Sequence, residues 1–357
     1  MAGSGYFRTT YAGDMKVVTT RFRLFWLIVL GALLLLFPFV CSSYWVHLMN
    51  LALINCLVAL GLNVLTGRAG VISLGHGGIF AAGAYIVGIL DVQFHVPFLL
   101  VLPATMAAGV ILGLVMGLPS LRLRALYIIV GTMAMHFILV YIGKAYQQSI
   151  PAFAWGITVP EPSLGPLVLN TSFKWYPVLI GIVLIVTVFT VNLLNRSRVG
   201  RAWTATGDRD FVAFALGIHI GYYKLLAFMF SSALVALGGG LSAYYQSFVT
   251  AESYTLWLGV TFVAMVLIGG LGSITGSFFG ALFVTLLPYT LAQLLTALPL
   301  SSFLGARKAA LEIIFFGLLI VLFLILEPTG LAGIWKRISH YFSLWPFRYR
   351  RSMITTR

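Results

Sequence analysis

Few residues in this chain have the types and spacing that chemistry requires. His76 and His136 each lie in a long apolar segment, with no second metal ligand at helical spacing. The sequence contains no GxxxxGK(S/T) phosphate loop, no paired carboxylates and no nucleophile beside a recognisable base. The acids near apolar segments all lie at segment edges: Asp91, Glu252, Glu312 and Glu327. We therefore expect no catalytic residues, no cofactor, no bound metal and no ion coupling through buried acids.

Polar residues inside apolar segments are candidates for contact with a polar solute. Asn63 lies in one such segment, and Ser73, Gly75 and His76 follow it closely. Amide and imidazole groups at this depth need partners, so they face other helices or a wet cavity. Both interpretations stay open. The glycine-rich stretch Gly67–Gly78 predicts a broken or tightly packed helix, because each glycine costs up to about 1 kcal/mol relative to alanine.

One charged segment, residues 195–224, interrupts the apolar sequence and must lie in water. Asp208 is a favourable N-cap, Asp210 falls in the first turn, and Gly217 is a natural stop. The apolar residues between them share one helical face: Phe211, Phe214, Ala215 and Ile218. We expect a helix of roughly two to three turns, about 12 Å long. Such a helix either rests on lipid headgroups or docks in a groove of a soluble partner.

The elements that carry these residues are membrane spans. Charged residues make up only 8% of the chain and the mean hydropathy is +1.03, values that no water-soluble domain of this length shows. The pattern predicts an all-α polytopic integral membrane protein with about ten transmembrane helices. The expected spans are 24–41, 44–66, 71–90, 98–118, 125–142, 177–195, 225–246, 258–274, 276–296 and 309–326.

The distribution of basic residues orients these spans. Placing both termini in the cytoplasm leaves only four of the 22 Lys and Arg residues outside: Lys144, Lys174, Arg307 and Lys308. The expected organisation is a cytoplasmic segment 1–23, a single transmembrane domain 24–326 with a cytoplasmic loop 196–224, and a basic-aromatic cytoplasmic tail 327–357. The tail fits anionic lipid headgroups, so the net charge of +14 does not imply nucleic acid. The first span lacks a cleavage site and is expected to be an anchor.

Regularly spaced glycines predict close helix contacts. Gly109, Gly113 and Gly117 form a doubled GxxxG, which gives a flat stripe for packing. A second set combines a hinge with another GxxxG: Gly269, Gly270, Gly272, Gly276 and Gly280. The proline-rich loop 143–176 is the longest external loop, and it either meets an extracytoplasmic partner or caps the domain.

Two stretches carry a resemblance to a known family. ALGLNVLTG at 59–67 runs into SLGH at 73–76, and a longer stretch from Gly200 to about Leu291 includes GRAW, GDRDFVAFALGI and LIGGLGSITGSFFGALFVTLLP. Together they resemble the branched-chain amino acid ABC importer permeases. The chain length is closer to the LivM-type subunit than to the shorter LivH-type subunit. Urea-type permeases share these signatures, so a urea or short-amide permease is the alternative substrate assignment.

The resemblance implies that the domain 24–326 is the permease domain of an ATP-driven importer in the plasma (inner) membrane. Its expected partners are a second homologous, LivH-type permease subunit, two cytoplasmic ABC ATPases and an extracytoplasmic solute-binding protein. Residues of the charged segment would then couple to an ATPase cleft: Asp208, Arg209, Asp210, Phe211, Ala213, Phe214, Ala215, Gly217 and Ile218. Many relatives have Arg where Gly207 stands, and an acid where Asp210 or Phe214 stands. Phe214 makes this helix more apolar, so the cleft should be apolar too.

Two other classes of function are rivals to an ATP-driven permease. A facilitator or secondary carrier would need no ATPase, and its uptake would survive ATP depletion when the ion gradient is held. A membrane-embedded enzyme would need a catalytic constellation, which the sequence does not contain.

Overall fold

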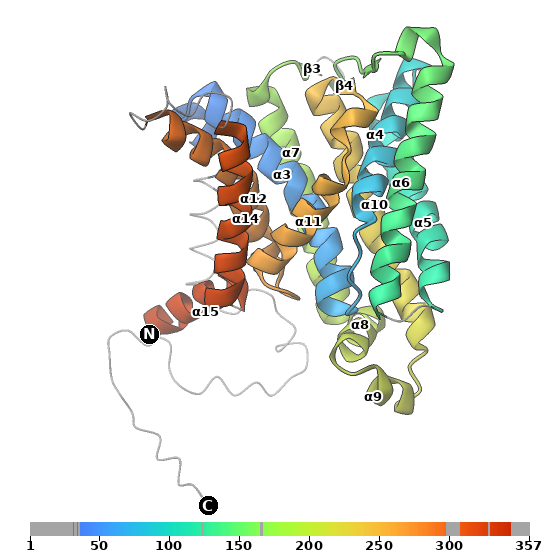
Figure 1. Cartoon of the computed structure of the whole chain (residues 1–357), viewed down its shortest axis with the longest axis vertical. Coiled ribbons are helices and arrows are strands. Elements are labelled where there is room, and N and C mark those ends of the chain that lie inside the picture. Colours follow the sequence, from blue (N-terminus) through green and yellow to red (C-terminus); the bar gives the residue numbers. More distant parts are fainter. Residues whose placement is uncertain are drawn as a thin grey trace, which may run out of the picture.

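The chain folds into a helical bundle, shown as a computed structural model in Figure 1. The structure describes residues 31, 34, 36–122, 125–164, 167–297, 308–327 and 329–343. Its long helices are α3 (Ser43–Asn63), α4 (His76–Val92), α5 (Phe98–Ser120), α6 (Ala125–Ser149), α7 (Ser172–Arg196), α10 (Ile220–Gln246), α11 (Leu256–Gly269), α12 (Ile274–Ala297) and α14 (Lys308–Leu326). The predicted all-α polytopic class is confirmed. The segment 1–23, most of the span 24–41 and the tail beyond 343 lie outside the described residues.

Seven helices of the described part are long and apolar enough to cross a membrane: Ser43–Arg68, Phe98–Ser120, Tyr127–Ser149, Ser172–Arg196, Ile220–Gln246, Ala251–Gly269 and Ile274–Gln293. The predicted span 71–90 appears as the shorter apolar helix α4, and the predicted span 309–326 coincides with α14. The chain is therefore a multi-pass membrane protein. The count of ten spans stays a prediction.

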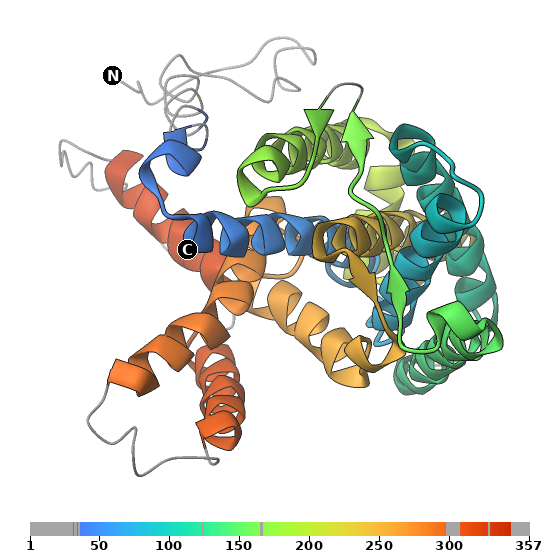
Figure 2. The ribbon, with the colours of Figure 1, turned by 90° about the horizontal axis from the view of Figure 1, so that it is seen from above.

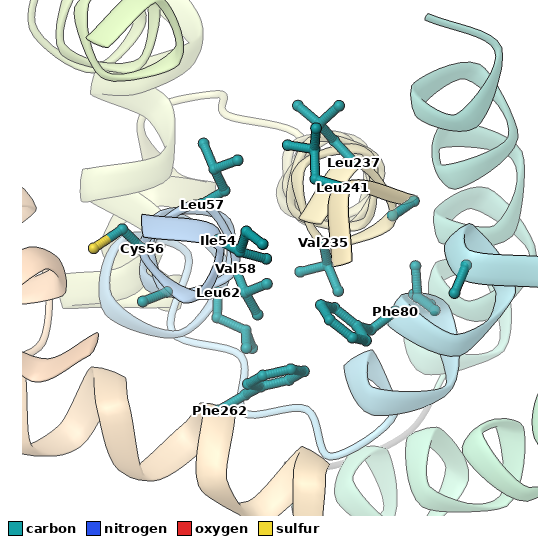
Figure 3. Packing of buried hydrophobic residues seen from close by; sticks show 14 of the residues in the cluster. Ile54, Cys56, Leu57, Val58, Leu62, Phe80, Val235, Leu237, Leu241 and Phe262 are labelled. Carbon is teal, nitrogen blue, oxygen red and sulfur yellow. The ribbon is translucent and has the colours of Figure 1, made fainter. Parts of the chain in front are cut away.

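Helices α3 and α10 form the centre of the bundle. In each of their apolar windows 78% of residues are buried, against 22% for α6 and 28% for α5 and α7. Figure 2 shows α3 and α10 surrounded, with α4, α5 and α6 on one side and α12 and α14 on the other. Val58 of α3, Val235 of α10, Phe80 of α4 and Phe262 of α11 point toward one another in the core (Figure 3). The outer helices direct apolar side chains outward, as lipid contact requires: Leu99, Ile111, Tyr141, Ile185 and Leu318.

The chain between α3 and α4 is a broken helix, as the glycine density predicts. Helix α3 continues as the five-residue π-helix η1 (Val64–Arg68), and the backbone then leaves helical geometry until α4 begins at His76. Gly70 has a φ of +70°, a conformation that favours glycine. Ala69, Val71 and Ser73 are buried, whereas Gly70 and Ile72 are exposed, so protein covers one side of this non-helical backbone.

The spaced glycines lie at helix crossings. Gly109, Gly113 and Gly117 are buried against α10, where a Cβ on Gly113 would lie 2.7 Å from the Phe228 carbonyl oxygen. On the other side of the bundle a Cβ on Gly280 would lie 2.9 Å from the Gly269 Cα, and Gly276 also abuts Gly269. Gly270 and Gly272 form the turn between α11 and α12, with φ values of +109° and +73°.

Short strands and 3₁₀ turns close the end of the bundle that we call the loop end. Its elements are η2 (Pro151–Phe153), β1 (Ile157–Thr158), β2 (Ser163–Leu164), β3 (Leu167–Val168), β4 (Phe248–Val249) and η3 (Ala251–Ser253). Strand β1 pairs antiparallel with β4, and β2 pairs with β3. Helix α6 continues to Ser149 and α7 begins at Ser172, so the non-helical loop is shorter than the predicted 143–176. Ile157 and Val159 are buried, so the loop caps the bundle.

Candidate functional site

The charged segment forms two helices at the end of the bundle opposite the loop end, and we call this the α8–α9 end (Figure 1). Helix α8 spans Arg198–Asp208 and α9 spans Asp210–Ala215. The prediction that Asp208 N-caps a helix of two to three turns is wrong. Asp208 ends α8, and the extended backbone of Arg209 (φ −155°, ψ 103°) separates it from α9. Helix α9 has only six residues, which is less than two turns.

Burial of α8 explains why it takes in Asp208. Trp203 is 1% exposed, and its indole Nε1 donates to the Tyr223 carbonyl oxygen at 2.8 Å. Ser197 N-caps the helix by accepting from the Gly200 amide at 3.0 Å. These contacts hold α8 against the bundle. The packing of Trp203 therefore outweighs the local preference of Asp208 for an N-cap position.

Helix α9 carries an apolar exposed surface. Phe211 is 83% exposed and Phe214 is 68% exposed, while Leu216 just beyond the helix is 72% exposed. Ala215 is exposed and Ile218 is half-buried, whereas Ala213 is only 1% exposed and faces the protein. The periodicity did not identify Leu216, which lies beyond the helix. Phe211, Phe214 and Leu216 together form an exposed apolar surface, which we call the knob of α9. Exposure of such a surface to water is unfavourable.

Two contacts at its ends hold α9 in place. Asp210 forms an ion pair with Lys224 of α10 at 2.6 Å, which ties the start of α9 to a central helix. At the other end Gly217 adopts a φ of +79°, and its amide donates to the Phe214 carbonyl oxygen at 2.9 Å. The Ile218 amide donates to the Ala213 carbonyl oxygen at 3.0 Å, so the helix ends in a Schellman motif and the predicted stop at Gly217 is confirmed.

Helix α8 contacts the break between α3 and α4. A Cβ on Gly207 would clash with the Arg68 carbonyl oxygen, and a Cβ on Gly70 would lie 3.2 Å from the Gly207 Cα. This close approach explains the glycine at 207, because an arginine side chain would begin in the space that the Arg68 carbonyl fills. The charged segment and the glycine-rich break, more than a hundred residues apart, therefore meet at one backbone contact.

Asn63 joins α3 to the turn between α11 and α12. Its side-chain Nδ2 donates to the Ser273 carbonyl oxygen at 2.7 Å and to Ser277 Oγ at 2.6 Å, and its Oδ1 accepts from the Gly272 amide at 2.7 Å. The side chain is 4% exposed. Of the two interpretations that the sequence left open, these bonds favour contact between helices.

Ser73, Gly75 and His76 lie together at the start of α4. The two ring nitrogens of His76 are hydrogen-bonded to Ser73 Oγ at 2.9 Å and to Ser231 Oγ of α10 at 3.0 Å. The Gly75 amide donates to Ser73 Oγ at 3.3 Å. Ser73 and His76 are buried and the ring of His76 stacks on Phe228, so this cluster joins α4 to α10. The bonds to Ser73 and Ser231 occupy both imidazole nitrogens.

A cavity of about 440 Å³ separates α8 from the α11–α12 turn. Arg68, Thr204, Asp208, Ser273 and Lys336 are among its lining residues, the last from α15 (Gly330–Ser343). Arg68 Nη1 makes a long contact of 3.4 Å with Thr204 Oγ1, and its Nε is buried without a partner in the described part of the chain. The sequence patterns did not identify Arg68 or Thr204 as lining residues. The available signal was the pair Gly67 and Gly70 on either side of Arg68, because two glycines let another backbone segment approach closely.

The sequence of this bundle matches a known protein family. Residues 44–324 match the family described as the branched-chain amino acid transport system / permease component. The chain belongs to this family. The match covers the bundle from α3 to α14, including the broken helix, α8, α9 and the α11–α12 turn. The predicted resemblance is confirmed.

Individual relatives agree with the family match. The chain is 31% identical over 278 residues to the high-affinity branched-chain amino acid transport system permease protein LivM of Escherichia coli (strain K12), across 71% of this chain and 65% of the relative. It spans slightly less than two thirds of that relative's length. A probable branched-chain amino acid transport permease protein LivH of Methanocaldococcus jannaschii is 23% identical over 80% of this chain and 91% of its own length.

More distant similarity extends to another transport system. The autoinducer 2 import system permease protein LsrC of Escherichia coli (strain K12 / DH10B) is 27% identical over 52% of this chain and 54% of its own length. No solved structure matches the chain. The family thus rests on the sequence match, and the LivM-type assignment rests on the relatives that are 31% identical.

Proposed function

We propose that this chain is the transmembrane permease subunit of an ATP-driven importer for branched-chain or related amino acids. The observation that carries the proposal is the exposed apolar knob of α9, formed by Phe211, Phe214 and Leu216. Such a surface at the water-facing end of a membrane protein fits a groove on a soluble partner. The partner of this chemistry is one of two ABC ATPases, which supply the hydrolysis that the chain itself lacks.

The contacts around α9 supply a route from the ATPase to the spans. Asp210 and Lys224 attach α9 to α10, and Gly207 of α8 rests on the Arg68 carbonyl at the broken helix. Asn63 then links α3 to the α11–α12 turn. Through these contacts a displacement of α9 on ATP-driven closure reaches both central helices and this turn. In this proposal the broken helix and the α11–α12 turn are the parts that switch between inward and outward arrangements.

The orientation belongs to the same proposal. At the α8–α9 end the described residues include Arg68, Arg196, Arg198, Arg201, Arg209 and Lys336, whereas α6 and α7 bring Lys144 and Lys174 to the loop end. This asymmetry supports a cytoplasmic α8–α9 end, cytoplasmic termini, about ten spans and a place in the plasma (inner) membrane. A LivH-type permease and an extracytoplasmic solute-binding protein complete the proposed assembly.

Docking can be tested by placing charge on the knob. Phe211→Asp and Phe214→Asp, singly and together, should abolish co-purification of the ATPase and ATP-dependent leucine uptake while leaving the amount of permease in the membrane unchanged. Both side chains are exposed, so the substitutions do not disturb the core. Trp155→Asp is the matched control, because Trp155 is 92% exposed at the loop end. Undiminished ATPase capture by the double variant would refute docking through α9, and uptake that survives ATP depletion would point to a facilitator.

A further inference from the structure

A second cavity lies at the loop end, away from the α8–α9 end. It has a volume of about 110 Å³ and lies where α3, α7, α10 and the capping loop meet. Its polar and aromatic lining comes from all four: His47, Glu161, Asn170, Ser172, Trp175 and Tyr245. Since a water molecule needs about 10–15 Å³ of such space, the cavity is large enough for a small polar head group with some of its hydration.

The lining is held by hydrogen bonds before any ligand arrives. The Tyr245 hydroxyl lies 2.7 Å from His47 Nδ1 and 3.2 Å from Ser172 Oγ. Asn50 of α3 is completely buried, and its Nδ2 donates to the Ser172 carbonyl oxygen at 2.8 Å and to the Tyr245 hydroxyl at 3.3 Å. Asn50 Oδ1 has no hydrogen-bond partner among the described residues. Asn50 is not among the lining residues, so its contribution is to hold Ser172 and Tyr245 in position.

The groups around this cavity favour a cation. Glu161 provides the formal negative charge, no Lys or Arg is among the lining residues, and the hydroxyl of Ser172 can accept. The Tyr245 hydroxyl already has three partners, Asn50, His47 and Ser172, so it holds the lining in place. Trp175 and Tyr245 pack edge to face at 5.8 Å, and the His47 ring stacks on Tyr245 at 5.4 Å. These contacts between the rings make one wall of the cavity rigid. Lys174, which is not among the lining residues, donates a hydrogen bond from its Nζ to Asn170 Oδ1 at 2.9 Å.

We propose that this cavity binds the primary ammonium group of an amino-acid solute as the solute enters the permease from the loop end. An ammonium carries three donors and a positive charge, which match the Glu161 carboxylate and the Ser172 hydroxyl of the lining. The proposal rests on the proposed function for the identity of the solute, and it gives that solute an entry point. It also gives the capping loop a role beyond closing the bundle, because Glu161 and Asn170 come from it.

Binding to the purified full-length chain in lipid nanodiscs tests the site directly. Leucine and isopentylamine, which lacks the carboxylate, should both change the tryptophan fluorescence, and Trp175→Phe should remove that change. Isocaproate, which lacks the amine, should not bind. Glu161→Gln and Tyr245→Phe should each weaken isopentylamine binding at least about threefold. Glu252→Gln is the matched control, since Glu252 is an exposed acid at the same end and is not among the lining residues.

The outcomes separate this site from the proposed function. Equal binding of isocaproate and isopentylamine, or unchanged affinity in both Glu161→Gln and Tyr245→Phe, overturns the ammonium site whatever the uptake data show. ATP-dependent leucine uptake with an unchanged KM in both variants also overturns it, while leaving the importer assignment intact. Amine-selective binding without ATP-dependent uptake supports the site and counts against the importer.

Discussion

At the scale of single residues, two buried polar side chains connect segments that are distant in the sequence. Asn63 makes three hydrogen bonds to residues 272, 273 and 277, and His76 bonds to Ser231. Each buried polar group that loses its partner costs about 1–3 kcal/mol, because lipid and protein offer no replacement. Asn63 therefore contributes to stability through the groups that it satisfies, and it fixes the position of the α11–α12 turn.

Replacement of Asn63 tests this account. Asn63→Ala should lower the free energy of unfolding by at least about 2 kcal/mol, because it leaves the Gly272 amide and the Ser273 carbonyl without this partner. Asn55→Ala is the matched control: Asn55 is half-buried and its Nδ2 donates to Thr285 Oγ1 at 2.9 Å, so the loss of this bond should cost about 1 kcal/mol. Thermal unfolding of both variants in the same detergent measures the difference. Equal losses in Tm would contradict a special role for Asn63.

At the scale of elements, the bundle depends on helices that approach closely where glycine removes the side chain. Gly109, Gly113 and Gly117 follow one face of α5 and all three are buried against α10. Not every helical glycine has this role. Gly181 of α7 faces open space, because a Cβ at this position would have no neighbour within 4 Å. Glycine therefore allows close helix packing at residues 109, 113 and 117, whereas at residue 181 it only lowers the stability of its own helix.

Alanine at these two glycines should change stability in opposite directions. Gly113→Ala places a Cβ 2.7 Å from the Phe228 carbonyl oxygen and 2.8 Å from Ser232 Oγ, so α5 must move away from α10 at a cost of about 1–3 kcal/mol. Gly181→Ala meets no such contact and should stabilise the helix by up to about 1 kcal/mol. The Tm of each variant, compared with that of the wild type, measures these changes. A Gly113→Ala protein at least as stable as wild type would show that α5 and α10 are not packed this closely.

At the scale of the whole molecule, the two ends of the bundle are chemically different. The α8–α9 end carries most of the described basic residues and the apolar knob, whereas the loop end is capped by short strands and contains the small polar cavity. An importer needs such asymmetry, since its energy source and its solute approach from opposite sides. The orientation of the bundle is thus the property on which both proposals depend.

Cysteine labelling tests that orientation. The background is Cys41→Ser, since Cys41 is partly accessible and Cys56 is buried. In that background Trp155→Cys should react with a membrane-impermeant maleimide added to intact spheroplasts, and Phe211→Cys should react only in inside-out vesicles. Both positions are exposed, at 92% and 83%, so access to the reagent depends on the side of the membrane. Labelling of residue 211 from outside would invert the topology and remove the basis for ATPase docking.

The sequence alone determined the membrane class, the broken helix after α3 and the family, and it predicted that the charged segment 196–224 faces water. These follow from local properties: apolar length, glycine density, charge and contiguous motifs. It also located Phe211 and Phe214 as apolar residues in that segment, but it placed the start of their helix at the wrong residue.

Only the tertiary structure decided what those residues touch. Burial of Trp203 extends α8 through Asp208 and leaves α9 with six residues. The partners of Asn63 and one of the two partners of His76 lie more than a hundred positions along the chain. The loop-end cavity gathers residues from three helices and a loop. Such arrangements depend on which distant segments pack together, and the free energy of that packing is a property of pairs of segments that no local pattern contains.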